Sequence, residues 1–162
     1  MIEKLDTKCH YPLKKGDYYI YDDDINNKPL FCKVDEKWNL NIINKSNINV
    51  DFFQNDECLM TNKNLKKCDW IIIFKDEFYF IEAKDVKIKQ RSKAKKNAEK
   101  KFEVTIPYFL NLYPEIEEMK IKVILNLRST SNLTSSADKN RRNRYNVNYN
   151  TKYIETNSLT FN

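Results

Sequence analysis

Residues 69–84 read Asp-Trp-Ile-Ile-Ile-Phe-Lys-Asp-Glu-Phe-Tyr-Phe-Ile-Glu-Ala-Lys, and the prediction of the fold begins from them. The apolar run 70–74 is rich in β-branched residues, which is typical of a strand buried on both faces. Residues 75–77 form a short polar turn, and residues 78–84 form the returning strand. This segment therefore predicts a buried β-hairpin between Asp69 and Lys84.

A helix and a further strand are expected after the hairpin. Ser92 is a suitable N-cap, and Pro107 is expected to end or kink the helix. The apolar residues of one helix face recur at intervals of four: Ala94, Ala98, Phe102 and Ile106. Residues 119–127 have the composition of another strand.

Shorter strand-like runs precede the hairpin. Residues 18–21, 30–34 and 38–43 are separated by turn signals, and they predict an antiparallel meander. Residues 58–60 are expected to begin the central sheet.

The chain ends in a polar segment, 129–150, which is expected to be a loop, and a last strand within 153–161. The order of elements predicts an α+β fold in which a central mixed β-sheet carries one principal helix. With 162 residues the chain is expected to be a single domain, 1–162. We divide it into an N-terminal β-rich elaboration (1–50), a core (56–127), and a polar loop with a C-terminal strand (128–162).

Two rare residue types exclude whole classes of chemistry. The single glycine, Gly16, excludes the glycine-rich loops that bind nucleotides. The single histidine, His10, excludes metal sites built on paired imidazoles. The remaining candidates are carboxylates and lysines, with or without a metal ion.

The cysteines and the hydropathy indicate the compartment. The chain has no apolar run long enough to span a membrane and no secretory signal, so we expect a cytoplasmic protein with no membrane association. Four cysteines have no zinc-binding spacing and are expected to be reduced, mostly buried thiols: Cys9, Cys32, Cys58 and Cys68.

Positive charge is concentrated in one segment, 87–101. It holds eight Lys and Arg against one Asp or Glu, whereas the rest of the chain holds 21 against 22. Local positive charge attracts phosphates, although a solvated helix face is the alternative. The expected nucleic-acid-binding residues are Lys87, Lys89, Arg91, Lys93, Lys96 and Lys100. A smaller group, at 139–144, is expected to be solvated.

Three ionisable residues are expected to converge at one end of the hairpin. Glu82 and Lys84 share a strand face, and Asp69 lies opposite residue 82, 83 or 84 in every compatible register. Two carboxylates so close together repel each other unless a cation joins them, and Mg²⁺ favours such oxygen ligands. The alternative is a salt bridge between Lys84 and either acid.

This pattern resembles the core of the PD-(D/E)XK nuclease superfamily, which has the restriction-endonuclease-like fold. The resemblance covers residues 56–127 and implies that Asp69 and Glu82 bind Mg²⁺ or Mn²⁺ and that Lys84 is the catalytic lysine. Cys68 stands where the family name has proline. Three acids are candidates for the upstream acidic residue that many members carry: Glu3, Asp56 and Glu57.

The sequence therefore predicts a metal-dependent nuclease that acts on nucleic acid, DNA rather than RNA, and that forms a homodimer to cut both strands. Two alternatives stay open. One is a nuclease-fold protein that binds nucleic acid, or serves as a subunit of a complex, without cutting. The other is an interaction domain whose aromatic N-terminal sheet binds a partner protein.

Overall fold

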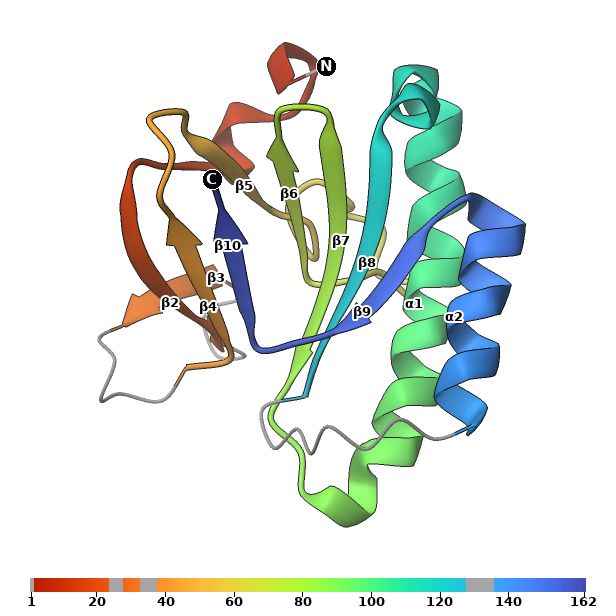
Figure 1. Cartoon of the computed structure of the whole chain (residues 1–162). Coiled ribbons are helices and arrows are strands. Elements are labelled where there is room, and N and C mark those ends of the chain that lie inside the picture. The colour runs from red at the N-terminus through yellow and green to blue at the C-terminus, as the bar shows by residue number, and fades with distance from the viewer. Residues whose placement is uncertain (1, 24–27, 33–37, 128–135) are drawn as a thin grey trace.

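Two β-sheets and two α-helices form three layers in a computed structural model that describes residues 2–23, 28–32, 38–127 and 136–162. Helices α1 (Arg91–Leu112) and α2 (Ser136–Tyr149) lie side by side on one face of the larger sheet (Figure 1). The smaller sheet covers the other face. This arrangement confirms the predicted α+β fold with a mixed central sheet and one principal helix.

The central sheet has six strands in the order β1-β5-β6-β7-β8-β9. Their bounds are β1 His10–Leu13, β5 Val50–Gln54, β6 Trp70–Phe74, β7 Glu77–Lys84, β8 Lys120–Leu127 and β9 Lys152–Glu155. The first four strands pair antiparallel, and β8 and β9 continue the sheet in parallel. Strand β1 lies within residues 1–50 yet forms an edge of this sheet, so the first fifty residues contribute to both sheets.

The smaller sheet has the order β10-β4-β2-β3. Its strands are β2 Gly16–Asp23, β3 Lys28–Cys32, β4 Leu40–Asn44 and β10 Ser158–Phe161. The N-terminal strands are antiparallel, as predicted, but β2 lies between β3 and β4 and not at an edge. Strand β4 begins at Leu40 and not at residue 38, and residues 33–34 of the predicted second strand lie outside the described residues.

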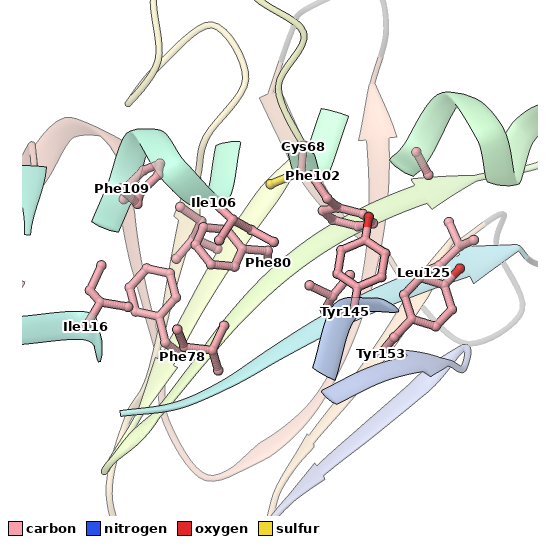
Figure 2. Packing of buried hydrophobic residues seen from close by; sticks show 14 of the residues in the cluster. Cys68, Phe78, Phe80, Phe102, Ile106, Phe109, Ile116, Leu125, Tyr145 and Tyr153 are labelled. Atoms are coloured by element: carbon pink, nitrogen blue, oxygen red, sulfur yellow. The ribbon is translucent and has the colours of Figure 1, made fainter. Parts of the chain in front are cut away.

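Strand alternation divides the buried residues into two cores. On β7, Phe78 and Phe80 pack with α1, whereas Tyr79, Ile81 and Ala83 face the smaller sheet. Figure 2 shows the helix-side core, where Phe78 and Phe80 lie near Ile106 and Phe109 of α1. Even-numbered residues of β7 therefore face α1, and this alternation extends to positions 82 and 84.

Helix α1 differs from its prediction at both ends. It begins at Arg91 after a short 3₁₀ helix (Ile88–Gln90), so Gln90 and not Ser92 is the N-cap. It also continues through Pro107 to Leu112. Ile106 and Phe109, on either side of the proline, are buried in the same core, and this packing outweighs the hydrogen bond that proline cannot make.

The segment predicted as a polar loop forms helix α2 from Ser136 onward, and residues 129–135 lie outside the described residues. Few apolar side chains hold α2, chiefly Tyr145, which is buried. Ion pairs attach it to α1: Lys95 to Asp138, at 2.8 Å, and Arg141 to Glu99. No apolar periodicity marks such a helix, which is why the sequence did not predict it.

The C-terminal segment predicted as one strand forms two, because a bend at residues 156–157 separates β9 from β10. The two strands belong to different sheets and connect the layers. None of the helices within the described residues is long and apolar enough to cross a membrane.

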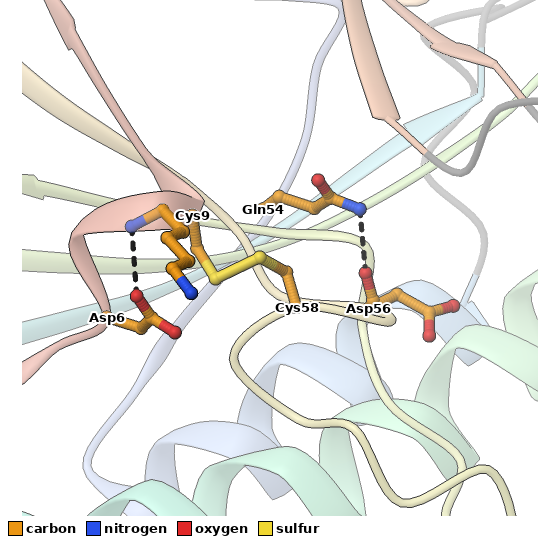
Figure 3. Close-up of a disulfide and its surroundings, with 6 residues drawn as sticks. Asp6, Cys9, Gln54, Asp56 and Cys58 are labelled. Carbon is orange, nitrogen blue, oxygen red and sulfur yellow. Dashed lines mark hydrogen bonds between the residues drawn. A yellow bond between two sulfur atoms is a disulfide. The ribbon is translucent and has the colours of Figure 1, made fainter.

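Two expectations about residues 58–60 were wrong. The segment is a turn that makes only an isolated bridge between Asp56 and Met60, so it does not begin the central sheet. Cys58 forms a disulfide with Cys9 and is not a reduced thiol (Figure 3). The bond connects two segments 49 residues apart, a proximity that local patterns do not reveal. Among the described residues, Cys32 and Cys68 form no disulfide, as expected.

Candidate active site

Asp69 lies immediately before β6, at the end of the hairpin where β7 finishes. Trp70 pairs with Ile81, and continuing this register by one residue places Asp69 opposite Glu82. Asp69 and Glu82 are on the same face as Ile71 and Phe80, which pack against α1. Both acids therefore point into the space between the sheet and the helix.

The structure brings together the three residues that the sequence singled out. The Lys84 Nζ lies 3.9 Å from Asp69 Oδ1 and 3.6 Å from Glu82 Oε1. The Asp69 carboxylate is fixed at its other oxygen, because Oδ2 accepts a hydrogen bond of 2.8 Å from the backbone N–H of Ala83. Asp69 is 3% exposed and Glu82 is 1% exposed, so two acids are buried at one point.

A fourth residue, Lys101 of α1, completes the cluster. Its Nζ lies 3.1 Å from Asp69 Oδ1, and 2.7 and 2.9 Å from the two carboxylate oxygens of Glu82. It is closer to both acids than Lys84, and its side chain is 21% exposed against 38% for Lys84. Lys101 was expected only as part of the basic segment 87–101 and not as part of the site.

Thr105, four residues after Lys101, attaches this part of α1 to the segment that carries Asp69. Thr105, one turn further along α1, donates to the Lys101 carbonyl and accepts a hydrogen bond of 3.0 Å from the backbone N–H of Cys68. Cys68 directly precedes Asp69, so this bond fixes α1 against the strand that carries the acid. Asn55 supports the same segment, because its side chain donates to the Cys68 carbonyl at 2.8 Å.

Burial raises the pKa of both acids, and the two neighbouring lysines lower it. Burial, and then the negative charge of Asp69, raise the pKa of Glu82 well above its usual range, although Lys101 and Lys84 oppose this. For Asp69, burial alone would raise the pKa, but Lys101, Lys84 and the Ala83 N–H outweigh it and lower the pKa. The pKa of Lys101 is raised, because the attraction of both acids outweighs its own burial. Asp69 is thus the more firmly ionised acid.

A pocket of about 400 Å³ opens beside the acids, between the end of β7 and the first turns of α1. Its lining residues are Glu82, Lys84, Val86, Gln90, Lys93, Ala94, Asn97 and Lys101. The three lysines bring positive charge to a space of the size that small ligands occupy.

The predicted nucleic-acid-binding residues divide into two groups. Five are exposed: Lys87, Lys89, Lys93, Lys96 and Lys100. Arg91 differs, because its guanidinium is 3.7 Å from Glu155 and its side chain is largely buried. On α1, Lys93, Lys96 and Lys100 recur at helical spacing next to the positions that line the pocket, so they form one stripe at its rim.

The candidates for the upstream acidic residue lie elsewhere. Asp56 and Glu57 both pair with Lys67, at 3.2 and 3.4 Å, and Glu3 belongs to a short N-terminal 3₁₀ helix. Within the described residues, no three His, Cys, Asp or Glu side chains form a group that could hold a metal ion.

Asp69 and Glu82 together nevertheless have the donors that Mg²⁺ favours. Both direct oxygens at a single cation, the Lys101 ammonium. One or two carboxylates, with water and substrate phosphate, form a usual Mg²⁺ site in proteins. The residues therefore fit a divalent cation held by two protein side chains, provided that the ammonium moves.

Comparisons of the chain with protein-family models, curated proteins and solved structures found no match. The function is therefore inferred from the site itself.

Proposed function

We propose that the chain is a Mg²⁺-dependent nuclease of the PD-(D/E)XK type, which hydrolyses the phosphodiester bonds of DNA rather than those of RNA. The observation that carries the proposal is the burial of Asp69 and Glu82 against each other, with converging oxygens, beside a lysine-lined pocket. Burying two acids at one point is costly, and apolar residues would stabilise the same position better. A site that persists at such a cost is typical of function.

Each residue has a role in this proposal. Asp69 and Glu82 would hold Mg²⁺, which supplies an activated water and stabilises charge on the phosphate. Lys84, at the more exposed side of the acids, would orient that water or stabilise the negative charge that develops on the phosphate. The exposed lysines of residues 87–100 would bind the neighbouring phosphates of the strand.

A comparison of two lysine variants tests the proposal. Wild-type protein is expected to cleave DNA with Mg²⁺ and to stop when EDTA is added. Lys84→Ala should abolish cleavage with no change in circular dichroism, because Lys84 is partly exposed and at the rim of the site. Lys139→Ala, an exposed position on α2, removes the same charge elsewhere and should cleave like the wild type. Full turnover by Lys84→Ala would refute the assignment.

A second candidate is a nuclease-fold protein that binds nucleic acid without cutting it. The position of the Lys101 ammonium favours it, since two lysines already neutralise the two acids without a metal. Tight, salt-sensitive DNA binding with no cleavage under Mg²⁺, Mn²⁺ or Ca²⁺ would select this candidate.

The proposal extends to partners and compartment. A homodimer would present two sites to the two strands of a duplex. A nuclease acting on cellular nucleic acid would be cytoplasmic, and the Cys9–Cys58 disulfide is the observation that opposes this location, because such bonds are rare there.

A further inference from the structure

We propose that Lys101 is the resident cation of this site: its ammonium leaves the two acids when a phosphate enters the adjoining pocket, and the divalent metal then takes its place. This inference rests on the proposed function and deepens it, since it makes substrate and metal bind together. It concerns the order in which the site is filled, which the nuclease assignment alone does not specify.

The contacts show that the ammonium and a metal compete for the same place. Lys101 Nζ bonds Asp69 Oδ1 and both oxygens of Glu82 at 3.1 Å or less. Asp69 and Glu82 are also the residues that would hold a divalent metal, through the same carboxylate groups. A divalent cation and an ammonium so close together would repel strongly in a site shielded from water. The two cations therefore exclude each other.

The pocket offers the displaced ammonium a second position. Lys101 lines it together with Lys84 and Lys93, so the same side chain faces acids on one side and a cationic pocket on the other. A lysine side chain is flexible and carries three donors, so rotation alone can redirect it to a phosphate. The helix itself need not move, since Thr105 holds its backbone against Cys68.

Charge explains why the two ligands would bind together. In the free site two ammonium groups face two carboxyl groups. A divalent cation arriving alone adds positive charge to a site that has no excess of negative charge. A phosphate supplies that negative charge and also attracts Lys101. Because this coupling is reciprocal, the metal strengthens phosphate binding by the same factor by which phosphate strengthens metal binding.

The first test uses metal alone, without nucleic acid. Mn²⁺ affinity is measured by electron paramagnetic resonance for wild-type protein, Lys101→Met and Lys139→Met. Lys101→Met should bind Mn²⁺ roughly tenfold or more tightly than wild type, which lies within the usual range of coupling between sites. Lys139→Met removes an equal charge outside the site and should match wild type. Unchanged or weaker Mn²⁺ binding by Lys101→Met overturns the proposal.

Melting temperatures keep the test decisive if Lys101→Met folds poorly. Without metal this variant loses one of the two lysines that pair with the buried acids, so it should melt below wild type. Mn²⁺ should restore it while changing the wild type little. If Met is not tolerated, Lys101→Gln keeps a hydrogen-bond donor without the charge and should respond to Mn²⁺ in the same way. A lowered melting temperature that Mn²⁺ does not restore in either variant overturns the proposal.

The last measurement separates this inference from the nuclease assignment. A labelled DNA oligonucleotide is titrated with and without Ca²⁺. Ca²⁺ should tighten DNA binding by wild type more than by Lys101→Met. In the wild type, DNA must draw the Lys101 ammonium away before Ca²⁺ can bind, whereas Lys101→Met can hold Ca²⁺ without DNA. Equal tightening contradicts the exchange even if the protein cleaves DNA. Metal affinities that behave as expected in a protein that never cleaves would refute the nuclease and leave the exchange standing.

Discussion

At the scale of single residues, Thr105 is the clearest positioning residue of the site. Its hydroxyl accepts a hydrogen bond from the backbone N–H of Cys68 and donates one to the carbonyl of Lys101, one turn earlier in α1. Neither of these two bonds involves a carboxylate of the site. Thr105→Val keeps the shape and removes the acceptor, which leaves a buried N–H unpaired. We expect a loss of about 1–3 kcal/mol in the free energy of unfolding, measured by urea denaturation.

The catalytic consequence distinguishes positioning from stability alone. If Thr105 aligns Asp69 with α1, Thr105→Val should lower the cleavage rate at saturating DNA while leaving the DNA affinity near that of wild type. Thr105→Ser retains the hydroxyl and should recover the rate. A rate equally low in the serine and valine variants would show that the hydroxyl is not what matters.

Glu77 gives a pH-dependent prediction away from the site. Although burial opposes it, hydrogen bonds from Lys122 and from the Tyr79 hydroxyl lower the pKa of Glu77. A carboxyl whose pKa is lowered by folding contributes stability above its unfolded pKa of about 4.3 and loses it as the pH falls through the folded value. Glu77→Gln should therefore melt below wild type at pH 7, and the gap should close in acid. A gap that widens with acid would contradict this cause.

The local chemistry of the site could be predicted where it follows from strand geometry. Asp69, Glu82 and Lys84 converge because residues 69–84 by themselves determine the hairpin register and the two-residue alternation of its strands. Lys101 could not be assigned in the same way, because its place depends on how α1 rotates against the sheet. One signal was available: Lys101 follows Asn97 by four residues and Ala94 by seven, so the three share one helix face, and this face lines the pocket.

At the scale of elements, strands with strong apolar patterns were predicted and weakly patterned elements were not. Strands β6, β7 and β8 carry their own pattern, and each occurs where the sequence placed it. Helix α2 is attached by the buried Tyr145 and by ion pairs with α1, and neither one apolar residue nor charged residues give a periodic signal. The order of the smaller sheet depends on contacts far apart in sequence, which turn signals do not specify.

The disulfide gives the element-scale prediction. It attaches the first residues of the chain to the turn at 55–60, where the Asn55 N–H also bonds the Asp69 carbonyl. Cys9→Ser with Cys58→Ser should lower the free energy of unfolding by roughly 2–4 kcal/mol, because the bond restricts the unfolded chain. The comparison is made by denaturation of the double variant and of wild type, with and without reductant. Reductant should lower the stability of the wild type and leave that of the double variant unchanged.

At the scale of the whole molecule, its positive charge is one surface feature and not a general property. Residues outside 87–101 carry almost no net charge, and part of the positive charge within this segment is internal. Lys95 pairs with Asp138 and Glu155, and Arg91 lies near the same Glu155. These pairs attach α1 to α2 and β9, so under the proposed function the exposed lysines of the segment are left to bind a phosphate backbone: Lys87, Lys89, and the stripe of Lys93, Lys96 and Lys100.

The separation of exposed lysines from ion-paired basic residues predicts how DNA binding responds to salt. Each phosphate neutralised by a lysine contributes about 0.9 to the slope of log affinity against log salt concentration. Lys96→Ala and Lys100→Ala should each reduce that slope by up to this amount, and the double variant by about their sum. Lys139→Ala, exposed on α2, should leave the slope unchanged. The measurement is fluorescence anisotropy of a labelled duplex across a salt series. An equal reduction by Lys139→Ala would mean that DNA responds to net charge alone, and an unchanged slope in the stripe variants would remove the stripe from the interface.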